Sequence, residues 1–316
     1  MPRREPGRKW GKGVPIAQRG PGWTYRPDDT TPSVHNPRQP GIVTPHLRHA
    51  LLTAYEMADL REVTERAEAR MREAGGTVTI GLGPGAFDDA HRPTALRPLP
   101  AFAGDDLDPA RCGGDLAVLI CADDGPPEPL ALQAHARWSR RGIRGDRGAL
   151  GFREGTLNLK RPRDFDRHVW VRRDDRSGMI GGTYLVVRDI AVNPSWAELP
   201  EREQERVIGR DKRTGAPLSG TRLYDPPILE RLPPDAHIRV AAPRTSSVAI
   251  LRRGYDTDEG LLFLAFMADP RRQFVPLQRR LAKHDALHRH TRATGSAVFA
   301  IPPGAAPNSF IAQSLL

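Results

Sequence analysis

The chain alternates short apolar runs with amphipathic stretches, and this order appears on both sides of a glycine-rich segment, GALGFREGTLNLK. In the first half, HALLTAYEMA at 49–58 has the composition of a buried strand. Residues 60–76 place apolar side chains at helical spacing and end in glycine, and 77–83 alternates as a strand does. An apolar run at 113–124 and a stretch of helical spacing at 129–142 follow. The first half therefore predicts strands packed against two helices.

The second half repeats this order after the glycine-rich segment. Strands are predicted at 168–173, 183–192, 246–255, 260–268 and 296–303, and helices at 196–209 and 273–291. We therefore predict an α+β protein of two ferredoxin-like βαβ-type halves, with antiparallel sheets and helices. An extended or disordered arm at 1–41, rich in Pro, Gly and Arg, precedes an N-terminal domain at 42–150 and a C-terminal domain at 151–316.

The composition of the chain limits the classes of binding partner and the cellular location that we expect. The formal net charge is +10, mostly from arginine, which favours nucleic acid, a phosphate group or the carboxylates of a cofactor. The two cysteines are too few for a disulfide framework. No apolar run reaches the roughly 18 residues of a membrane span. Arg3 and Arg4 form a twin arginine, but Pro, Gly and Lys follow in place of an apolar segment, so we expect a cytoplasmic protein.

Three patterns have simpler interpretations than a functional site. GLGPG at 81–85 follows a strand but lacks the GxGxxG and P-loop spacings. His284 and His288 lie one helical turn apart, yet the basic helix around them lacks the glutamate of HExxH, which favours an exposed face. A basic ferredoxin-like nucleic-acid-binding module would carry paired exposed aromatic residues, and the predicted strands contain no such pair.

His237, Arg252 and Glu154 form a more informative set. His237 stands beside a predicted strand in PPDAHIRVAAPRT, where a lone histidine is most often a satisfied core residue. Arg252 follows in ILRRGY, and Glu154 lies between glycines in GFREG. A haem peroxidase needs an imidazole to hold iron, a carboxylate to move a proton and a guanidinium to stabilise anionic oxygen. The three residue types together predict such a pocket.

The chain resembles the dye-decolourising peroxidases from about residue 35 to its end. HNPRQPGIVTPHLRH at 35–49 is similar to the opening of that family, and LPAFAGDDLDPARCGGDLAVLICADD at 99–124 to its first-domain segment. In the second half, the blocks GGTYLVVRDI, VIGRDKRTGAPLSG, DAHIRVAAPRT, ILRRGY, GLLFLAF and DPRRQFVPLQRRLA follow in the order of the family. The resemblance implies a haem b enzyme of two ferredoxin-like halves, with haem in the second.

The resemblance also implies roles for individual residues. His237 corresponds to the axial ligand of the haem iron, Arg252 to the distal arginine, and Glu154 to the distal aspartate of a GxxDG motif. Asp269 is the candidate acceptor for the Nδ1 proton of His237. The haem would further contact Gly155, Thr156, Leu157, Arg210, Ala242, Pro243 and Arg244. By residue type alone, Arg210 and Arg244 would instead be solvated or paired with carboxylates such as Asp211.

The implied function is oxidation of organic donors, dye-like or phenolic, by hydrogen peroxide in one-electron steps. Electrons from bulky donors could pass through Trp170, Trp196, Tyr184 or Tyr255. Glutamate replaces the distal aspartate of the family, and a short DTDE segment after RRGY suggests an open haem edge. The alternative is a haem-binding protein, or a specialised biosynthetic haem oxidase with weak peroxidase activity. We expect no nucleic-acid or membrane partner, leave a homo-oligomer open, and interpret NSFIAQSLL as an ordinary tail, not a docking peptide for a protein shell.

Overall fold

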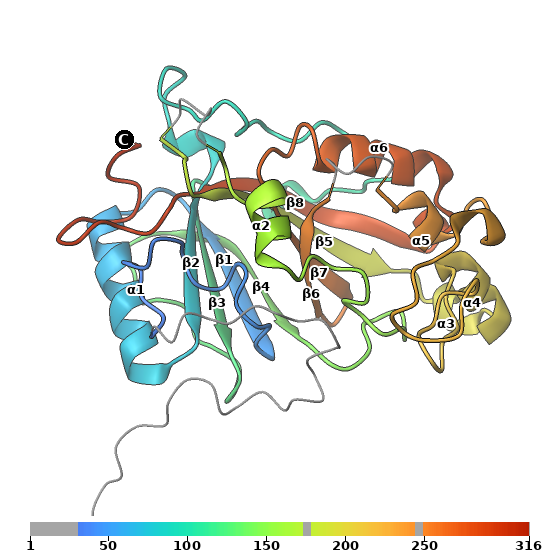
Figure 1. The fold of residues 1–316 in the computed structure, drawn as a ribbon. Coiled ribbons are helices and arrows are strands. Elements are labelled where there is room, and N and C mark those ends of the chain that lie inside the picture. Colours follow the sequence, from blue (N-terminus) through green and yellow to red (C-terminus); the bar gives the residue numbers. More distant parts are fainter. Residues whose placement is uncertain (1–30, 173–177, 244–248, 316) are drawn as a thin grey trace, which may run out of the picture.

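A computed structural model describes residues 31–172, 178–243 and 249–315 (Figure 1). Within these residues, eight antiparallel strands form a closed ring in the order β1-β3-β2-β8-β5-β7-β6-β4. The strands are β1 (His49–Tyr55), β2 (Thr77–Leu82), β3 (Leu116–Ala122), β4 (Ala136–Ile143), β5 (Thr183–Val192), β6 (Leu251–Asp256), β7 (Gly260–Met267) and β8 (Thr291–Ile301). The helices are α1 (Leu60–Ala74), α2 (Pro162–His168), α3 (Ser195–Glu198), α4 (Glu201–Ile208), α5 (His237–Val240) and α6 (Phe274–His284).

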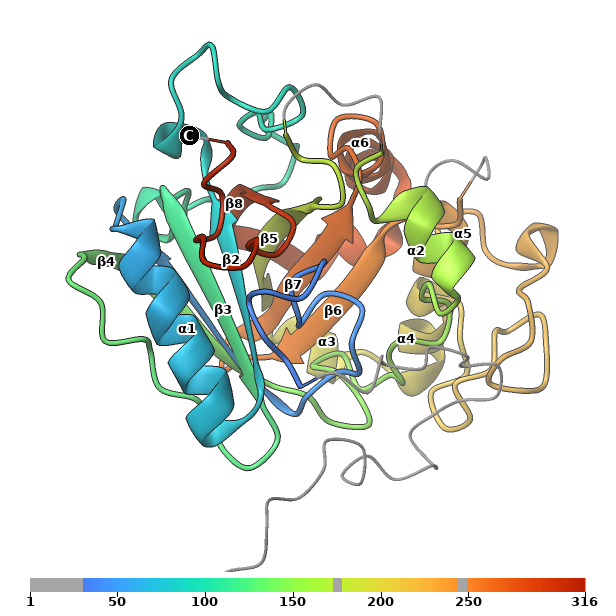
Figure 2. The ribbon, with the colours of Figure 1, turned by 60° about the vertical axis from the view of Figure 1, so that its left-hand side comes forward.

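Two four-stranded sheets make up the ring, one from each half of the chain. The first has the order β4-β1-β3-β2 and the second β8-β5-β7-β6. The pairs Leu82 with Ala300 and Ile143 with Asp256 join the two sheets at their edges. Figures 1 and 2 show α1 against the first sheet and α3, α4 and α5 together at the far end of the second half. This arrangement confirms the prediction of an α+β protein with two ferredoxin-like halves.

The strands bury one face inside the ring. Side chains from both sheets, such as Leu52, Leu119, Leu185 and Leu264, meet there in one cluster. Helix α1 covers the opposite face of the first sheet, and its buried residues recur every three or four positions, as an amphipathic helix requires. Because residues alternate along a strand, β6 buries Leu251, Arg253 and Tyr255, which leaves Arg252 and Gly254 on its outer face.

The helix predicted at 129–142 is wrong, because this segment contains strand β4. The exposure of its residues alternates along the strand, which is the period of a strand and not of a helix. Strand β1 pairs with β3 along one edge and with β4 along the other, so pairing with β1 overrides the local helical spacing. Trp138 fixes the strand further, since its Nε1 donates to the carbonyl oxygen of Gly113 at 2.9 Å.

Three further predictions need correction in the second half. The helix predicted at 273–291 ends at His284, and Thr291 already begins β8. Of the strand predicted at 168–173, the structure describes residues 168–172, which are the end of α2 followed by a loop in which Val169, Trp170 and Val171 are buried. A short apolar run indicates burial without specifying a strand. The helix predicted at 196–209 is split into α3 and α4. Pro200 disfavours helical geometry at the residue before it, and Leu199 is extended, with ψ of 137°.

The predicted arm at 1–41 can be followed only from residue 31. Residues 31–41 contain neither helix nor strand, yet they pack against the protein: Gln39 is buried, and its Nε2 donates to the carbonyl oxygens of Ile80 and Pro302, each at 3.0 Å. The predicted division at residue 150 lies in the loop between β4 and α2. No helix in the described part of the chain is both long and apolar enough to cross a bilayer.

Candidate functional site

Glu154 lies in a tight loop between β4 and α2. The loop folds back on itself, since the backbone N–H of Gly148 donates to the carbonyl oxygen of Phe152 at 3.0 Å. Gly155 has φ of +70°, a left-handed conformation that favours glycine directly after the acid. The side chain of Glu154 is 28% exposed. The loop conformation that Gly155 permits therefore places the carboxylate of Glu154 in a partly buried position.

Arg252 lies on the outer face of β6, and Asn158 connects this strand to the loop of Glu154. The Nδ2 of Asn158 donates to the carbonyl oxygen of Arg252 at 2.7 Å, and the backbone N–H of Arg252 donates to Oδ1 of Asn158 at 3.0 Å. This two-point contact fixes the position of Arg252 relative to the segment that follows Glu154. Sequence reasoning missed Asn158, because its role depends on pairing across 94 positions of the chain.

The structure brings Glu154 and Arg252 close enough for their charges to interact. Burial raises the pKa of Glu154; Arg144 and Arg252 oppose this shift, whereas Asp256 adds to it. Burial lowers the pKa of Arg252, and the negative charge of Glu154 opposes that shift. The outcome is a carboxyl group that takes up a proton more readily than usual, next to a cation that remains charged.

His237 is the first residue of α5, and its ring is bonded to a buried acid. Nδ1 of His237 lies 2.6 Å from Oδ2 of Asp285, whose side chain is 4% exposed. Because a carboxylate can only accept, Nδ1 donates, which leaves Nε2 with the lone pair that a metal would use. The Oδ1 of Asp285 accepts from the backbone N–H of Leu287 at 2.9 Å, and this bond holds the carboxylate in place.

The prediction that Asp269 accepts the Nδ1 proton of His237 is wrong. Oδ1 of Asp269 accepts from the backbone N–H of Arg271 at 2.9 Å, and its Oδ2 lies 2.9 Å from Nη2 of the same arginine. Asp269 precedes α6 and Asp285 follows it, so the whole helix separates the two acids. The signal in the sequence was the segment DAL, where an acid that begins a short turn is followed at once by buried apolar residues.

Arg210 follows α4 and is 3% exposed. Its Nη1 donates to the carbonyl oxygen of Gly215 at 2.6 Å, but within the described residues its buried Nη2 has no hydrogen-bond partner. Burial, and then the charge of Arg252, lowers the pKa of Arg210 to about 10. Asp211 does not neutralise it, since Asp211 accepts from the hydroxyl and the backbone N–H of Thr214 at 2.6 Å.

Helix α4, which precedes Arg210, packs against α5, the helix that begins with His237. Gly209 ends α4 with φ of +89°, and a methyl group there would lie 2.8 Å from the side chain of Ile238, the second residue of α5. Close packing of α4 on α5 thus sets Arg210 next to the helix of His237, while its charge interacts with Arg252. Arg210 therefore connects the region of the predicted axial ligand with that of the predicted distal pair.

The structure gives less information on the other residues predicted to contact haem. Leu157 is 46% exposed, and Thr156 lies beside it in the same loop. The carbonyl oxygen of Ala242 accepts from Nη2 of Arg280 at 2.9 Å, and Pro243 is exposed. Arg244 lies outside the described residues. The haem contacts predicted for these residues stay predictions.

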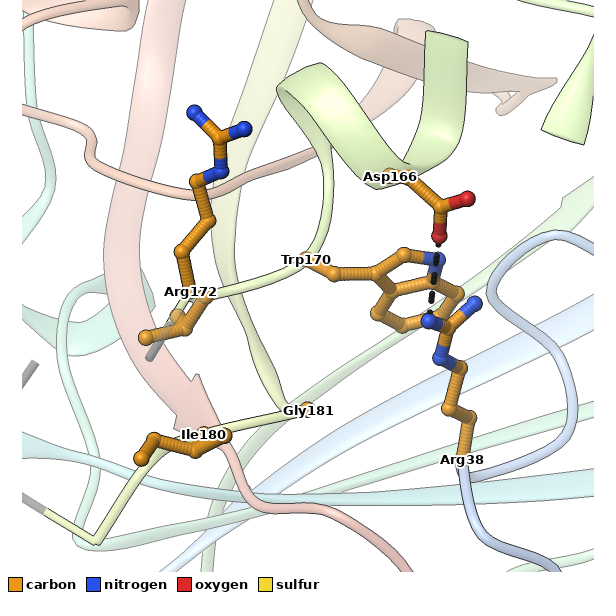
Figure 3. A pocket seen from close by; sticks show the side chains of 7 residues that line it. Arg38, Asp166, Trp170, Arg172, Ile180 and Gly181 are labelled. Carbon is orange, nitrogen blue, oxygen red and sulfur yellow. Dashed lines mark hydrogen bonds and ion pairs between the residues drawn. The ribbon is translucent and has the colours of Figure 1, made fainter. Parts of the chain in front are cut away.

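A separate hollow of about 720 Å³ opens near the end of α2 (Figure 3). Trp170 lies in its wall, with the guanidinium carbon of Arg38 4.4 Å above the ring. Nη2 of Arg38 also lies 3.1 Å from Oδ1 of Asp166. The full lining comprises Arg38, Asp166, Trp170, Val171, Arg172, Ile180 and Gly181. The hollow is thus distinct from the region of Glu154, Arg252 and His237.

Comparison with known proteins places this arrangement in a family. The family models described as Dyp-type peroxidase, N-terminal and C-terminal, match residues 39–136 and 145–306. The chain is 37% identical over 299 residues to a dye-decolorizing peroxidase of Thermobifida fusca (strain YX), covering 79% of this chain and 69% of that protein. It is 32% identical over 290 residues to a deferrochelatase of Yersinia pestis bv. Antiqua (strain Nepal516), covering 76% and 67%.

A solved structure agrees with this placement. The DyP-type peroxidase from Cellulomonas bogoriensis superposes with a TM-score of 0.82 at 34% sequence identity, covering 90% of this chain and 98% of that one. Both the matched domains and the shared fold extend across the two halves of the ring. The chain therefore belongs to the Dyp-type peroxidase family, a group of haem peroxidases.

Proposed function

We propose that this chain uses hydrogen peroxide to oxidise organic donors in one-electron steps, with haem held by His237 and with Glu154 and Arg252 on the opposite, distal side. The observation that carries the proposal is that Asn158 bonds the segment after Glu154 to the backbone of Arg252 on β6, and that the charges of Glu154 and Arg252 each affect the pKa of the other. The alternative of a solvated surface acid does not account for a glutamate that is largely buried beside two arginines.

The residues present fit a haem group. His237 offers Nε2 as a ligand, because Nδ1 is bonded to Asp285, and such a carboxylate partner makes an imidazole ligand more basic. The buried Nη2 of Arg210, which has no partner among the described residues, suits a propionate. These two features lie on neighbouring helices, α4 and α5, which pack closely through Gly209 and Ile238.

Haem, when bound, supplies an iron that exchanges electrons with peroxide and then with the donor. Glu154 would act as the proton carrier: its ionised carboxylate accepts a proton from one peroxide oxygen and returns it to the other, which leaves as water. Arg252 stabilises the negative charge that develops on the departing oxygen. The raised pKa of Glu154 favours uptake of that proton. Arg252 keeps its charge because a guanidinium stays protonated in proteins, and the negative charge of Glu154 opposes the effect of burial on its pKa.

A bulky donor would deliver its electron away from the iron. Trp196, Tyr184 and Tyr255 are buried, and Trp170, which is also buried, lines an open hollow. Trp170 packs in the same buried cluster as Leu251, the neighbour of Arg252 on β6. We therefore favour Trp170 as the residue that passes electrons inward from a donor at the hollow.

A second candidate function is haem handling, which the similarity to the deferrochelatase supports. In that case the chain would bind haem but react slowly with peroxide, and Glu154 in place of aspartate would mark the change of function. The predicted cytoplasmic location, the homo-oligomer and the absence of a protein-shell partner stay predictions.

Rapid mixing of the haem-loaded protein with hydrogen peroxide separates the two candidates. A peroxidase gives a fast change of the ferric absorption spectrum. The rate of this change should decrease as the pH is lowered through the raised pKa of Glu154, because a protonated Glu154 cannot accept a proton. If the ferric spectrum stays unchanged in excess peroxide, both in the native protein and in Glu154→Gln, the result would favour haem handling and contradict the proposed peroxidase activity.

A further inference from the structure

Glu154 has a second guanidinium beside it, from a residue outside the proposed haem site. Arg144 follows β4, and its backbone N–H donates to the carbonyl oxygen of Arg48 at 2.8 Å. Nη1 of Arg144 lies 3.4 Å from Oε2 of Glu154 and 3.4 Å from the carbonyl oxygen of Gly254. The two side chains are 22% and 28% exposed. Arg144 therefore connects the end of one sheet, β6 of the other sheet and the acid.

Two glycines form the remaining walls around the carboxylate. A methyl group at Gly148 would overlap Oε1 of Glu154, and one at Gly254 would lie 3.2 Å from Oε2. The longer side chain of glutamate thus has room to place its carboxylate against backbone on two sides. We refer to the space between Gly148 and Gly254 as the glycine niche. Arg144 stands at the niche beside the carboxylate.

The charged groups around the glycine niche have opposing effects on the pKa of Glu154. Asp256 on β6 pairs with Ile143 on the neighbouring strand β4, the residue before Arg144, and its Oδ1 accepts from the backbone N–H of Ala149 at 2.6 Å. Burial raises the pKa of Asp256, and Arg144 lowers it. The groups that act on Glu154 are therefore two cations, Arg144 and Arg252, and one carboxylate, Asp256.

We propose that Arg144 is a positioning residue for Glu154, whose guanidinium holds the carboxylate in the glycine niche and stabilises its ionised form. The contact itself does not depend on haem, although its use in proton transfer rests on the proposed function. Loss of Arg144 leaves Arg252 as the only one of these two cations that opposes burial and the charge of Asp256, so the carboxyl group of Glu154 would hold its proton to higher pH. Loss of the Asp256 charge acts in the opposite direction.

The test follows protonation of Glu154 directly, in the full chain loaded with haem. Infrared spectra recorded across pH, as differences from Glu154→Gln, report the C=O stretching band of the protonated carboxyl. In Arg144→Gln we expect the midpoint of that band to rise by about one pH unit or more. Arg144→Lys should recover much of the shift because it retains the charge, and Asp256→Asn should lower the midpoint.

A matched control separates charge from general disturbance of the strand. Arg141→Gln removes an arginine of β4 that pairs with Glu128, 3.0 Å away, and should leave the midpoint unchanged. An unmoved or lowered midpoint in Arg144→Gln, or an equal shift in Arg141→Gln, overturns the inference. If the midpoints shift as expected but no variant reacts with peroxide, the positioning role stands and the proposed peroxidase function fails.

Discussion

Nδ1 of His237 and Oδ2 of Asp285 lie 2.6 Å apart at the N-terminus of α5. If His237 binds the haem iron, this bond orients the ring and strengthens the ligand, so Asp285→Asn should lower haem affinity about 10- to 100-fold. Titration of the purified protein with haem, followed by absorbance, measures the change. Asp269→Asn is the matched control, because Asp269 pairs with Arg271 and should not affect affinity. Equal losses in both variants would contradict the role of Asp285.

Arg210 has one buried guanidinium nitrogen with no partner in the described part of the chain. A propionate at this nitrogen would form a charge-assisted hydrogen bond, so Arg210→Gln should weaken haem binding by about tenfold or more. The dimethyl ester of haem, which lacks the propionate charges, isolates this effect: native protein should prefer haem to the ester, and Arg210→Gln should lose much of that preference. Arg213→Gln, at an exposed neighbour, should keep it.

Glu154 occupies a niche that fits its length, so shortening it should harm the reaction with peroxide. In Glu154→Asp the carboxylate withdraws from Arg144 by about one methylene, and a displacement of that size can lower a rate by about 100-fold. Glu154→Gln should lose about 100- to 10,000-fold, since the amide cannot carry the proton. Stopped-flow mixing with peroxide gives both rates. A faster reaction in Glu154→Asp would show instead that the native glutamate slows the site.

Trp170 is the aromatic residue proposed to receive electrons at the hollow. Trp170→Phe should slow oxidation of a bulky organic donor and leave the reaction with peroxide unchanged, because phenylalanine is oxidised far less readily than tryptophan. Steady-state turnover of the donor and stopped-flow mixing with peroxide measure the two steps separately. Trp138→Phe on β4 serves as the control. Equal donor turnover in Trp170→Phe and native protein would exclude this route.

The sequence predicted the strands of both halves better than it predicted the ends of its helices. Strands such as 183–192 and 260–268 are apolar, buried on the inside of the ring and bounded by polar residues, so local pattern and tertiary structure agree. The prediction for the residues of β4 was wrong because pairing with β1, and not the local spacing of apolar residues, determines their structure. Pro200 carried a local signal for the break between α3 and α4 that the helical spacing concealed.

The sequence predicted site residues whose own side chain type suits the chemistry. It did not predict residues that act by hydrogen bonding to a site residue distant in sequence. Glu154 and Arg252 were expected to act together, and in the structure the charge of each affects the pKa of the other. Asp285, Asn158 and Arg144 were missed, since each acts on a residue between 10 and 94 positions away. No local pattern encodes such distances. They follow from closure of the ring and the packing of α4, α5 and α6.

The central claim is that His237 holds haem in this fold, and the absorption spectrum of the purified, haem-supplemented protein tests it most directly. We expect a Soret band in the native protein and a marked loss or shift of that band in His237→Ala, because an imidazole ligand to the iron is removed. A native protein without a Soret band, or a band that is the same in His237→Ala, would contradict the account.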